Sequence, residues 1–143
     1  MFYRDGVAEN QEDLVIDIEI RNIVEKLQKK YKNAPKLTFI IVTKRIDDRF
    51  GVTGKDGQLE NPKGGFIVQD EVVKDMCANF FMIAQKVNQG TATPTHYKVI
   101  LNQCDFKLPE IQKVTYDLAH FYYNWAGPVK VPSCVQYAHK CAY

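Results

Sequence analysis

The chain has 143 residues, of which 45% are hydrophobic and 12% aromatic; this suffices for the core of one globular domain and excludes an intrinsically disordered protein. No apolar run reaches the ~18–20 residues that a membrane-spanning helix requires, so we expect no membrane partner. The N-terminus lacks the basic and apolar blocks of a signal peptide, and the four cysteines (Cys77, Cys104, Cys134 and Cys141) form no C-x-x-C pair. These features predict reduced thiols in a protein of the cytoplasm or the nucleus.

The net charge of +2 is unevenly distributed along the chain. Residues 1–25 carry two basic and seven acidic side chains, whereas residues 26–49 carry eight basic and two acidic ones. A basic block beside an acidic one is typical of a polyanion-binding surface near a metal site. For the lysines of segment 26–32 we favour a simpler explanation, because cations stabilise the C-terminus of a helix.

The first two predicted elements are a strand and a long helix. Residues 1–5 have the pattern of a buried strand that ends at a turn, with the carboxylate of Asp5 at its end. Asn10 is a suitable N-cap for a helix over residues 11–32. One face of this helix is predicted from apolar residues at intervals of three or four, which are Ile16, Ile20, Ile23, Leu27 and Tyr31. Segment 16–20 also alternates as a strand does, but the longer pattern favours the helix.

A continuous apolar run over residues 37–42 predicts a strand that is buried on both faces, and therefore a sheet that is at least partly parallel. Lys44 and Arg45 follow the end of this strand. Ligands of open α/β sheets bind at the carboxyl ends of the strands. We therefore expect Asp5 to lie near Lys44 and Arg45 at one edge of the sheet.

The remainder predicts a loop or hairpin over residues 51–65, short strands over 66–68 and 80–83, and a longer strand over 97–101. A second helix is predicted from Pro109 to Trp125, with Gly127 and Pro128 beyond its end. Its apolar face would include the aromatic side chains of segment 121–125. The order of elements predicts an α/β fold, with a mixed sheet and flanking helices.

Asp5 and His139 are candidate metal ligands, although 134 positions separate them in the sequence. A carboxylate oxygen and an imidazole nitrogen suit Mg²⁺ or Mn²⁺. Each residue also has a simpler explanation, since a strand-end Asp is more often a turn or cap residue and a His in an aromatic tail more often packs. Glu9, Asp47 and Asp48 are expected to be solvated charges, so the sequence offers no strong third ligand. The absence of nucleophile-elbow, phosphate-loop and H-E-x-x-H motifs leaves nucleophilic catalysis and nucleotide hydrolysis without support.

Five motifs, in order along the chain, resemble those of the Argonaute/Piwi family. They are Tyr3-Arg4-Asp5-Gly6-Val7, the strand that ends in Lys44-Arg45, the loop Gln89-Gly90-Thr91-Ala92-Thr93-Pro94-Thr95-His96-Tyr97, the segment Tyr122-Tyr123-Asn124-Trp125-Ala126-Gly127, and Gln136-Tyr137-Ala138-His139-Lys140. The last two are more similar to the Piwi branch than to the Argonaute branch. Because the order holds over nearly the whole chain, the resemblance is specific.

The resemblance implies a ribonuclease H-like PIWI domain that cleaves RNA paired to a small guide, with Mg²⁺ or Mn²⁺ held by a D-E-D-H tetrad. By motif position, Asp5 would be the second Asp and His139 the His. The first Asp and the Glu lie upstream of this motif in the family. Residues 1–143 are therefore expected to form the C-terminal half of a PIWI domain. Alone, the chain would be inactive as an endoribonuclease.

The resemblance also implies that the chain lines a channel for a guide RNA and its complementary target RNA. The residues expected to contact RNA are Lys44, Arg45, Gln89, Thr91, His96, Tyr122, Lys130, Gln136 and Tyr137. Lys44 and Arg45 would neutralise phosphates, and the guide's own base pairing would supply sequence specificity.

Three functions remain open at this point. The chain is part of a catalytic PIWI domain, or part of a guide-binding protein that silences without cleavage, or a surface that recruits silencing cofactor proteins. The presence of both Asp5 and His139 favours the first. The aromatic stretch from Phe121 to Trp125 permits the third, although a buried helix face explains those residues more simply.

Overall fold

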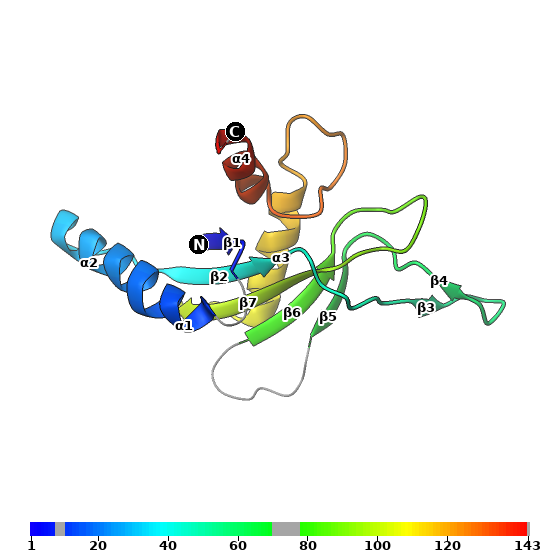
Figure 1. Cartoon of the computed structure of the whole chain (residues 1–143), viewed down its shortest axis with the longest axis horizontal. Helices are drawn as coiled ribbons and strands as arrows, with labels where there is room; N and C mark the ends of the chain where they lie inside the picture. Colours follow the sequence, from blue (N-terminus) through cyan, green and yellow to red (C-terminus); the bar gives the residue numbers. More distant parts are fainter. Residues whose placement is uncertain (8–10, 70–77, 143) are drawn as a thin grey trace.

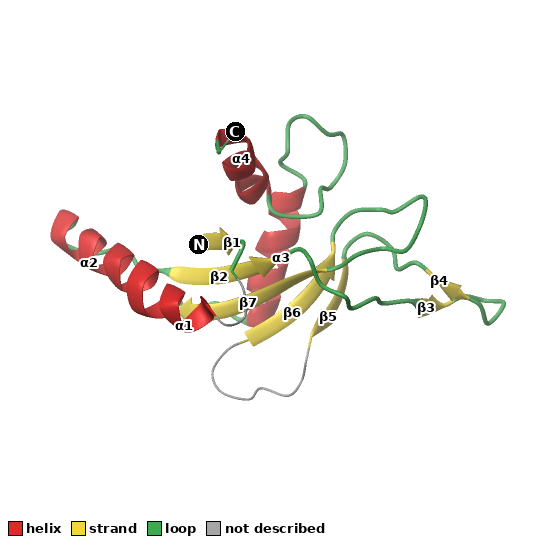
Figure 2. Ribbon diagram, in the orientation of Figure 1, coloured by secondary structure: helices red, strands yellow, loops and turns green. Residues whose placement is uncertain are grey.

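A five-stranded sheet forms the centre of the computed structural model, which describes residues 1–7, 11–69 and 78–142 (Figure 1). In spatial order its strands are β1 (Phe2–Asp5), β2 (Thr38–Thr43), β7 (Thr95–Asn102), β6 (Ala78–Ile83) and β5 (Phe66–Gln69). β1 runs parallel to β2, and the other neighbours are antiparallel. Helices lie on both faces of the sheet (Figure 2). The predicted mixed α/β fold is therefore confirmed.

β2 is buried on both faces, as its apolar run predicts. Phe39 and Ile41 belong to one cluster of buried side chains, under the N-terminal helix. Ile40 and Val42 point to the opposite cluster, which contains Ile111 and other side chains of the C-terminal helices. Because successive side chains of a strand point to opposite faces of the sheet, β2 contributes side chains to both hydrophobic clusters.

The N-terminal helix consists of three consecutive segments: α1 (Glu12–Leu14), a π-helical segment η2 (Val15–Ile20) and α2 (Arg21–Lys30). The π-turns rotate the side chains away from the regular α-helical pattern. Ile20 is buried as predicted, but Ile16 is 41% exposed, and Tyr31 is 46% exposed just beyond the helix, which ends at Lys30; the predicted places of Ile16 and Tyr31 on the apolar face are wrong. The predicted N-cap, Asn10, lies outside the described residues.

The helix predicted from Pro109 to Trp125 is shorter than expected, since α3 spans Leu108–Ala119. In a longer helix the Tyr123 amide would donate to the carbonyl of Ala119. Instead Val129 N–H donates to that carbonyl at 2.9 Å, and Tyr123 N–H donates to the hydroxyl of Tyr137, also at 2.9 Å. Residues 120–132 therefore form a loop that leads to α4 (Ser133–Cys141).

The predicted hairpin is present as β3 (Val52–Thr53) and β4 (Leu59–Glu60), which project from the sheet (Figure 1). Cys104, Cys134 and Cys141 are free thiols, as expected, and Cys77 lies outside the described residues. Within the described part of the chain, no helix combines the length and the apolar character that crossing a bilayer requires.

Candidate metal-binding site

Asp5 lies at the end of β1 because of local backbone geometry. It pairs with Val42 of β2, so the parallel register places Lys44 two residues beyond its partner. Gly6 follows with a φ of 75°, a left-handed conformation that glycine adopts without the penalty of a Cβ atom. The chain can therefore turn immediately after Asp5, and the carboxylate stays at the carboxyl edge of the two parallel strands.

The side chains of Asp5, Lys44 and His139 meet at this edge. Lys44 Nζ lies 2.7 Å from Asp5 Oδ2 and 2.6 Å from His139 Nε2, and His139 Nε2 also contacts Asp5 Oδ2. Only 15% of the Asp5 side chain is exposed, against 42% for His139. Three segments that are distant in sequence thus converge on one carboxylate.

Electrostatics favour the ionised form of Asp5. Burial alone would raise the pKa of its carboxyl, but the contacts with His139 and Lys44 outweigh burial and lower that pKa. Asp5 is therefore a carboxylate throughout the neutral range.

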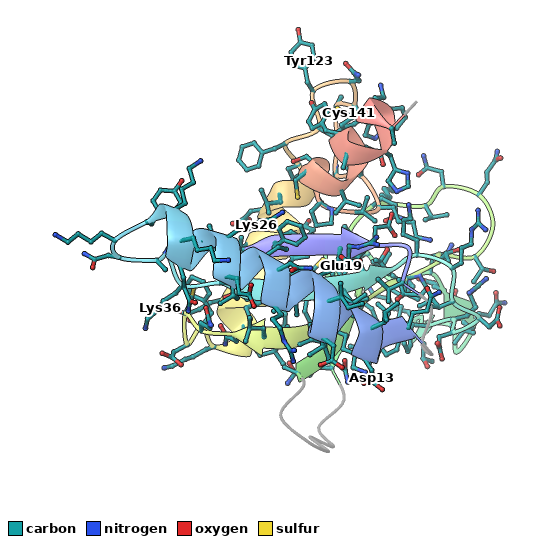
Figure 3. The ribbon with its side chains drawn as sticks, turned by 60° about the vertical axis from the view of Figure 1, so that its left-hand side comes forward. Asp13, Glu19, Lys26, Lys36, Tyr123 and Cys141 are labelled. Carbon is teal, nitrogen blue, oxygen red and sulfur yellow. The ribbon has the colours of Figure 1, made fainter. Side chains whose placement is uncertain are left out.

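Arg4 links the end of β1 to the N-terminal helix. Its guanidinium donates to both carboxylate oxygens of Glu19, from Nε at 2.8 Å and from Nη2 at 3.0 Å, and its Nη1 donates to the carbonyl of Asp5. Glu19 lies on the π-helical segment, close to β1 (Figure 3). The hydrogen bonds from Arg4 lower the pKa of Glu19. This forked ion pair fixes the main chain of Asp5 against the N-terminal helix.

Hydrogen bonds from a second segment hold the main chain of Lys44. Lys130 Nζ donates to the carbonyl of Lys44 at 2.9 Å, and the hydroxyl of Thr95 donates to the carbonyl of Lys130 at 3.2 Å. Burial, with the neighbouring charges of Arg49 and Lys44, lowers the pKa of Lys130. Two predicted RNA contacts, Lys44 and Lys130, therefore lie together beside Asp5.

A cavity of about 790 Å³ opens at this cluster. Asp5, Lys44 and His139 line it, and so do Arg45 and the acidic pair Asp47 and Asp48. The expectation that Asp5 lies near Lys44 and Arg45 is confirmed. The cavity gives a cation or a phosphate access to the side chains of the cluster.

The polar loop before β7 is held by a residue that the sequence did not single out. Asn61, at the end of the β3–β4 hairpin, donates to the carbonyl of Gly90 at 2.6 Å and accepts from the amide of Ala92 at 2.9 Å. These bonds leave the side chains of Gln89 and Thr91 exposed. In the sequence, Asn61 belongs only to the loop or hairpin predicted over residues 51–65.

The other predicted RNA contacts belong to separate groups. His96 stacks on Phe81 of β6, with ring centroids 4.5 Å apart. Tyr122 and Tyr137 meet at 5.2 Å between ring centroids. The Lys140 ammonium lies 5.4 Å from the centroid of the Tyr122 ring. Gln136 is half-buried on α4.

The aromatic stretch after α3 corrects one expectation. Tyr122 is 8% exposed, but Phe121, Tyr123 and Trp125 are 69%, 92% and 66% exposed. Figure 3 shows Tyr123 pointing away from the body of the molecule. The explanation of these side chains as a buried helix face is therefore wrong, because the helix ends at Ala119.

Asp5 and His139 suit a divalent cation by donor chemistry, and their side chains lie next to each other. A carboxylate oxygen and an imidazole nitrogen are both ligands of Mg²⁺ and Mn²⁺ sites. In the structure both atoms contact one cationic group, the ammonium of Lys44. Within residues 1–7, 11–69 and 78–142, no third His, Cys, Asp or Glu joins them in a group suited to a metal ion. The described residues therefore offer two ligands.

Comparisons with known proteins agree with the motifs. The family model of the Piwi domain matches residues 1–143. Protein argonaute-3 of Drosophila melanogaster is 40% identical over 143 residues, which are all of this chain and 16% of that protein. Piwi-like protein Siwi of Bombyx mori is 41% identical over 99% of the chain and 16% of its own length. The chain thus spans about one-sixth of these relatives.

Solved structures give the same result. The crystal structure of Drosophila Piwi matches with a TM-score of 0.87 and 36% identity, over 99% of this chain and 19% of that one. Kluyveromyces polysporus Argonaute, solved with a guide RNA, matches with a TM-score of 0.81 and 26% identity, over 96% of this chain and 17% of that one. A family model that covers the whole chain, together with the shared fold, establishes that this chain belongs to the Piwi domain family.

Proposed function

We propose that this chain is part of a PIWI domain that binds a small guide RNA and its target in RNA silencing, and that it contributes Asp5 and His139 to a Mg²⁺- or Mn²⁺-dependent site for RNA cleavage. The observation that carries the proposal is the convergence of Asp5 Oδ2 and His139 Nε2 on one cationic group. The relatives extend well beyond the matched region, and the remaining ligands would come from outside these 143 residues.

Each residue has a defined part in this site. Asp5 would hold the divalent ion through Oδ2, and its lowered pKa keeps the oxygen ionised for that purpose. His139 would add the lone pair of Nε2. When bound, the ion would polarise the scissile phosphate and activate the attacking water. Arg4 acts through the main chain of Asp5 and is a positioning residue.

Basic side chains near Asp5 would bind the RNA backbone. Lys44 and Arg45 line the cavity, and Lys130 lies against the carbonyl of Lys44. Phosphate contacts of this kind fix the position of the strand without reading its sequence. The other contacts that we propose come from the exposed loop at Gln89 and Thr91, from His96, and from the C-terminal residues Tyr122, Gln136 and Tyr137. One relative in the structural comparison was solved with a guide RNA, which supports a guide RNA as the ligand.

Guide-directed cleavage by the intact protein that carries this sequence tests the proposal. A 5′-phosphorylated guide and a complementary target are supplied with Mg²⁺, and cleavage and target binding are measured in the same samples. Asp5→Asn, which keeps the shape and removes the charge, should abolish cleavage and spare binding. His120→Ala is the matched control, because His120 is exposed and contacts Tyr116 rather than Asp5. Mg²⁺-dependent cleavage by the Asp5→Asn protein would reject the metal assignment.

A silencing protein that binds RNA without cleaving it is the alternative. Binding by the unchanged protein, with no cleavage in either Mg²⁺ or Mn²⁺, would support that alternative. The described residues favour the catalytic proposal because His139 and Asp5 are in direct contact, which binding of RNA alone does not require.

Recruitment of a silencing cofactor protein is a second candidate function, and the exposure of Phe121, Tyr123 and Trp125 favours it. Exposed aromatic side chains in one loop are typical of protein-binding surfaces. Serine substitution of all three should then impair silencing in cells while leaving guide binding and cleavage unchanged. Normal silencing by the substituted protein would reject this role.

A further inference from the structure

The position of Lys44 has a consequence for metal binding. Its ammonium lies 2.7 Å from Asp5 Oδ2 and 2.6 Å from His139 Nε2, so it uses the two atoms that would hold a divalent ion. Asp5 Oδ2 and His139 Nε2 are themselves in contact. The three polar atoms form one compact group, with no room for a metal ion between the carboxylate and the imidazole while the ammonium stays there.

The hydrogen bonds of His139 support the same conclusion. Nε2 lies within hydrogen-bond reach of both the Lys44 ammonium and Asp5 Oδ2, so it either accepts from the ammonium or donates to the carboxylate, and a metal ion requires its free lone pair instead. The carboxylate oxygen likewise already faces a full positive charge. A divalent ion must therefore replace Lys44 at both atoms.

The Lys44 side chain can leave without unfolding the site. Its main chain is fixed by Lys130 Nζ at the carbonyl and by the end of β2. The side chain is 29% exposed and borders the cavity of about 790 Å³. Four methylene groups let its ammonium swing away from Asp5 while the backbone stays in place.

We propose that Lys44 is an internal competitor of the divalent ion: its ammonium contacts both atoms of the Asp5–His139 pair, and metal binds only when that ammonium moves out. This inference rests on the proposed metal site and adds a residue that controls its affinity. The competition keeps the carboxylate neutralised in the absence of metal, and it lowers the affinity of the pair for free Mg²⁺ or Mn²⁺.

Titration of the 143-residue chain with Mn²⁺ tests the competition. Paramagnetic Mn²⁺ broadens the NMR signals of nearby nuclei, and the chain has three histidines, so the imidazole of His139 reports on the site. His120, on the loop end of α3, is the internal reference for nonspecific broadening. Lys44→Met keeps the length of the side chain and removes its charge. Arg45→Met is the matched control, because Arg45 borders the same cavity and its removal changes the net charge equally.

Lys44→Met should lower the Mn²⁺ concentration that half-broadens the His139 signal by roughly five- to tenfold, the scale of one unit-charge interaction at about 4 Å with water-like screening. Arg45→Met should lower it less than about threefold. Lys44→Arg, which keeps a cation, should remain within about twofold of the unchanged chain. Lys44→Gln carries the test if the Lys44→Met chain does not fold.

Equal Mn²⁺ affinity in the unchanged, Lys44→Met and Lys44→Gln chains would overturn the competition. An equal gain from Lys44→Met and Arg45→Met would also overturn it, because a general charge effect would then explain the data. Asp5→Asn in the Lys44→Met background separates this inference from the proposed function. If Asp5→Asn leaves the broadening of the His139 signal intact, the proposed metal site is wrong. If Asp5→Asn abolishes the broadening but Lys44→Met alone does not increase Mn²⁺ affinity, the metal site stands and only the competition is wrong.

Discussion

His139 on α4 contacts the carboxylate of Asp5 at the end of β1, although 134 residues separate them in the sequence. The packing of α4 produces this contact. Val135, on the same helix, is buried in a core cluster against which Tyr3 of β1 packs. The Tyr3 hydroxyl also lies 2.9 Å from the hydroxyl of Thr115 on α3, and burial raises the pKa of Tyr3 to about 12. The contact between His139 and Asp5 therefore depends on the packing of α4 against β1.

The ion pair between Arg4 and Glu19 gives a pH-dependent prediction. The folded-state pKa of Glu19 is lowered, so its contribution to stability is complete at neutral pH and is lost as acid protonates the carboxylate. Because both side chains are more than one-third exposed, solvent screens the pair, and Glu19→Gln should lower the free energy of unfolding at pH 7 by no more than about 1 kcal/mol. Urea unfolding at pH 7 and at about pH 3 measures this difference.

The difference between the Glu19→Gln and unchanged chains should shrink at the acidic pH, because protonation of Glu19 removes the ion pair. Asp17→Asn is the control, because its pair with Arg21 is longer, at 3.7 Å, and 69% exposed on both sides. This control should have a negligible effect at either pH. An equal loss of stability at both pH values would mean that the Glu19 contribution is steric and not ionic.

Arg45 gives a prediction about RNA binding. It is exposed at the mouth of the cavity beside Asp5, where it can neutralise one phosphate. Arg45→Ala should weaken guide binding at every guide sequence and reduce the slope of log Kd against log salt by about 1. Binding measured at several salt concentrations checks this, and an unchanged slope would remove Arg45 from the RNA channel.

Asn61 gives a prediction about the loop at residues 89–92. Asn61→Ala leaves the buried amide of Ala92 without its acceptor, which should cost about 1–3 kcal/mol in the free energy of unfolding. Hydrogen exchange at the Ala92 amide should accelerate accordingly. Asn61→Asp keeps the accepting oxygen and should protect that amide. Equal exchange rates in the two variants would contradict the role of Asn61 in holding the loop.

Trp125 gives a prediction about stability. It is 66% exposed on the loop after α3, so Trp125→Ser should change the free energy of unfolding by no more than about 0.5 kcal/mol. Phe39→Ala, at a fully buried position of β2, should cost about 3–5 kcal/mol by comparison. Thermal or urea unfolding distinguishes them. A large loss from Trp125→Ser would restore the explanation of this residue as part of a core.

The sheet could largely be predicted from the sequence, because each strand has its own local pattern of apolar residues. The run over residues 37–42 is apolar at every position but one and rich in β-branched side chains, a pattern typical of a strand buried on both faces. The end of α3 could not be predicted, because helical spacing continues through Trp125. Tertiary hydrogen bonds end the helix. The amide of Val129 bonds to the carbonyl of Ala119, and the amide of Tyr123 bonds to the hydroxyl of Tyr137, although a longer helix would pair the Ala119 carbonyl with the Tyr123 amide.

The candidate site followed from the sequence only in part. Asp5 and Lys44 could be placed together from the ends of two predicted strands, and the parallel pairing of β1 with β2 confirms this. His139 could be joined to them only by resemblance to a family, since no spacing rule connects residues so far apart. The roles of Asn61 and Glu19 could not be predicted from the sequence. Asn61 accepts a hydrogen bond from the main chain of another loop, and Glu19 pairs with an arginine on another element, so neither contact leaves a local sequence pattern.

The rate of guide-directed cleavage in a double-mutant cycle tests most directly whether Asp5 and His139 hold one metal ion. Single-turnover rates in Mg²⁺ are compared for the intact protein and its Asp5→Asn, His139→Ala and doubly substituted forms. Residues that act as a unit are non-additive, so each single change should slow cleavage at least about 100-fold and the double change should cost little more. A shared site would be contradicted if the rate reduction of the double variant equalled the product of the two single reductions. Near-normal cleavage by the His139→Ala protein would also contradict it.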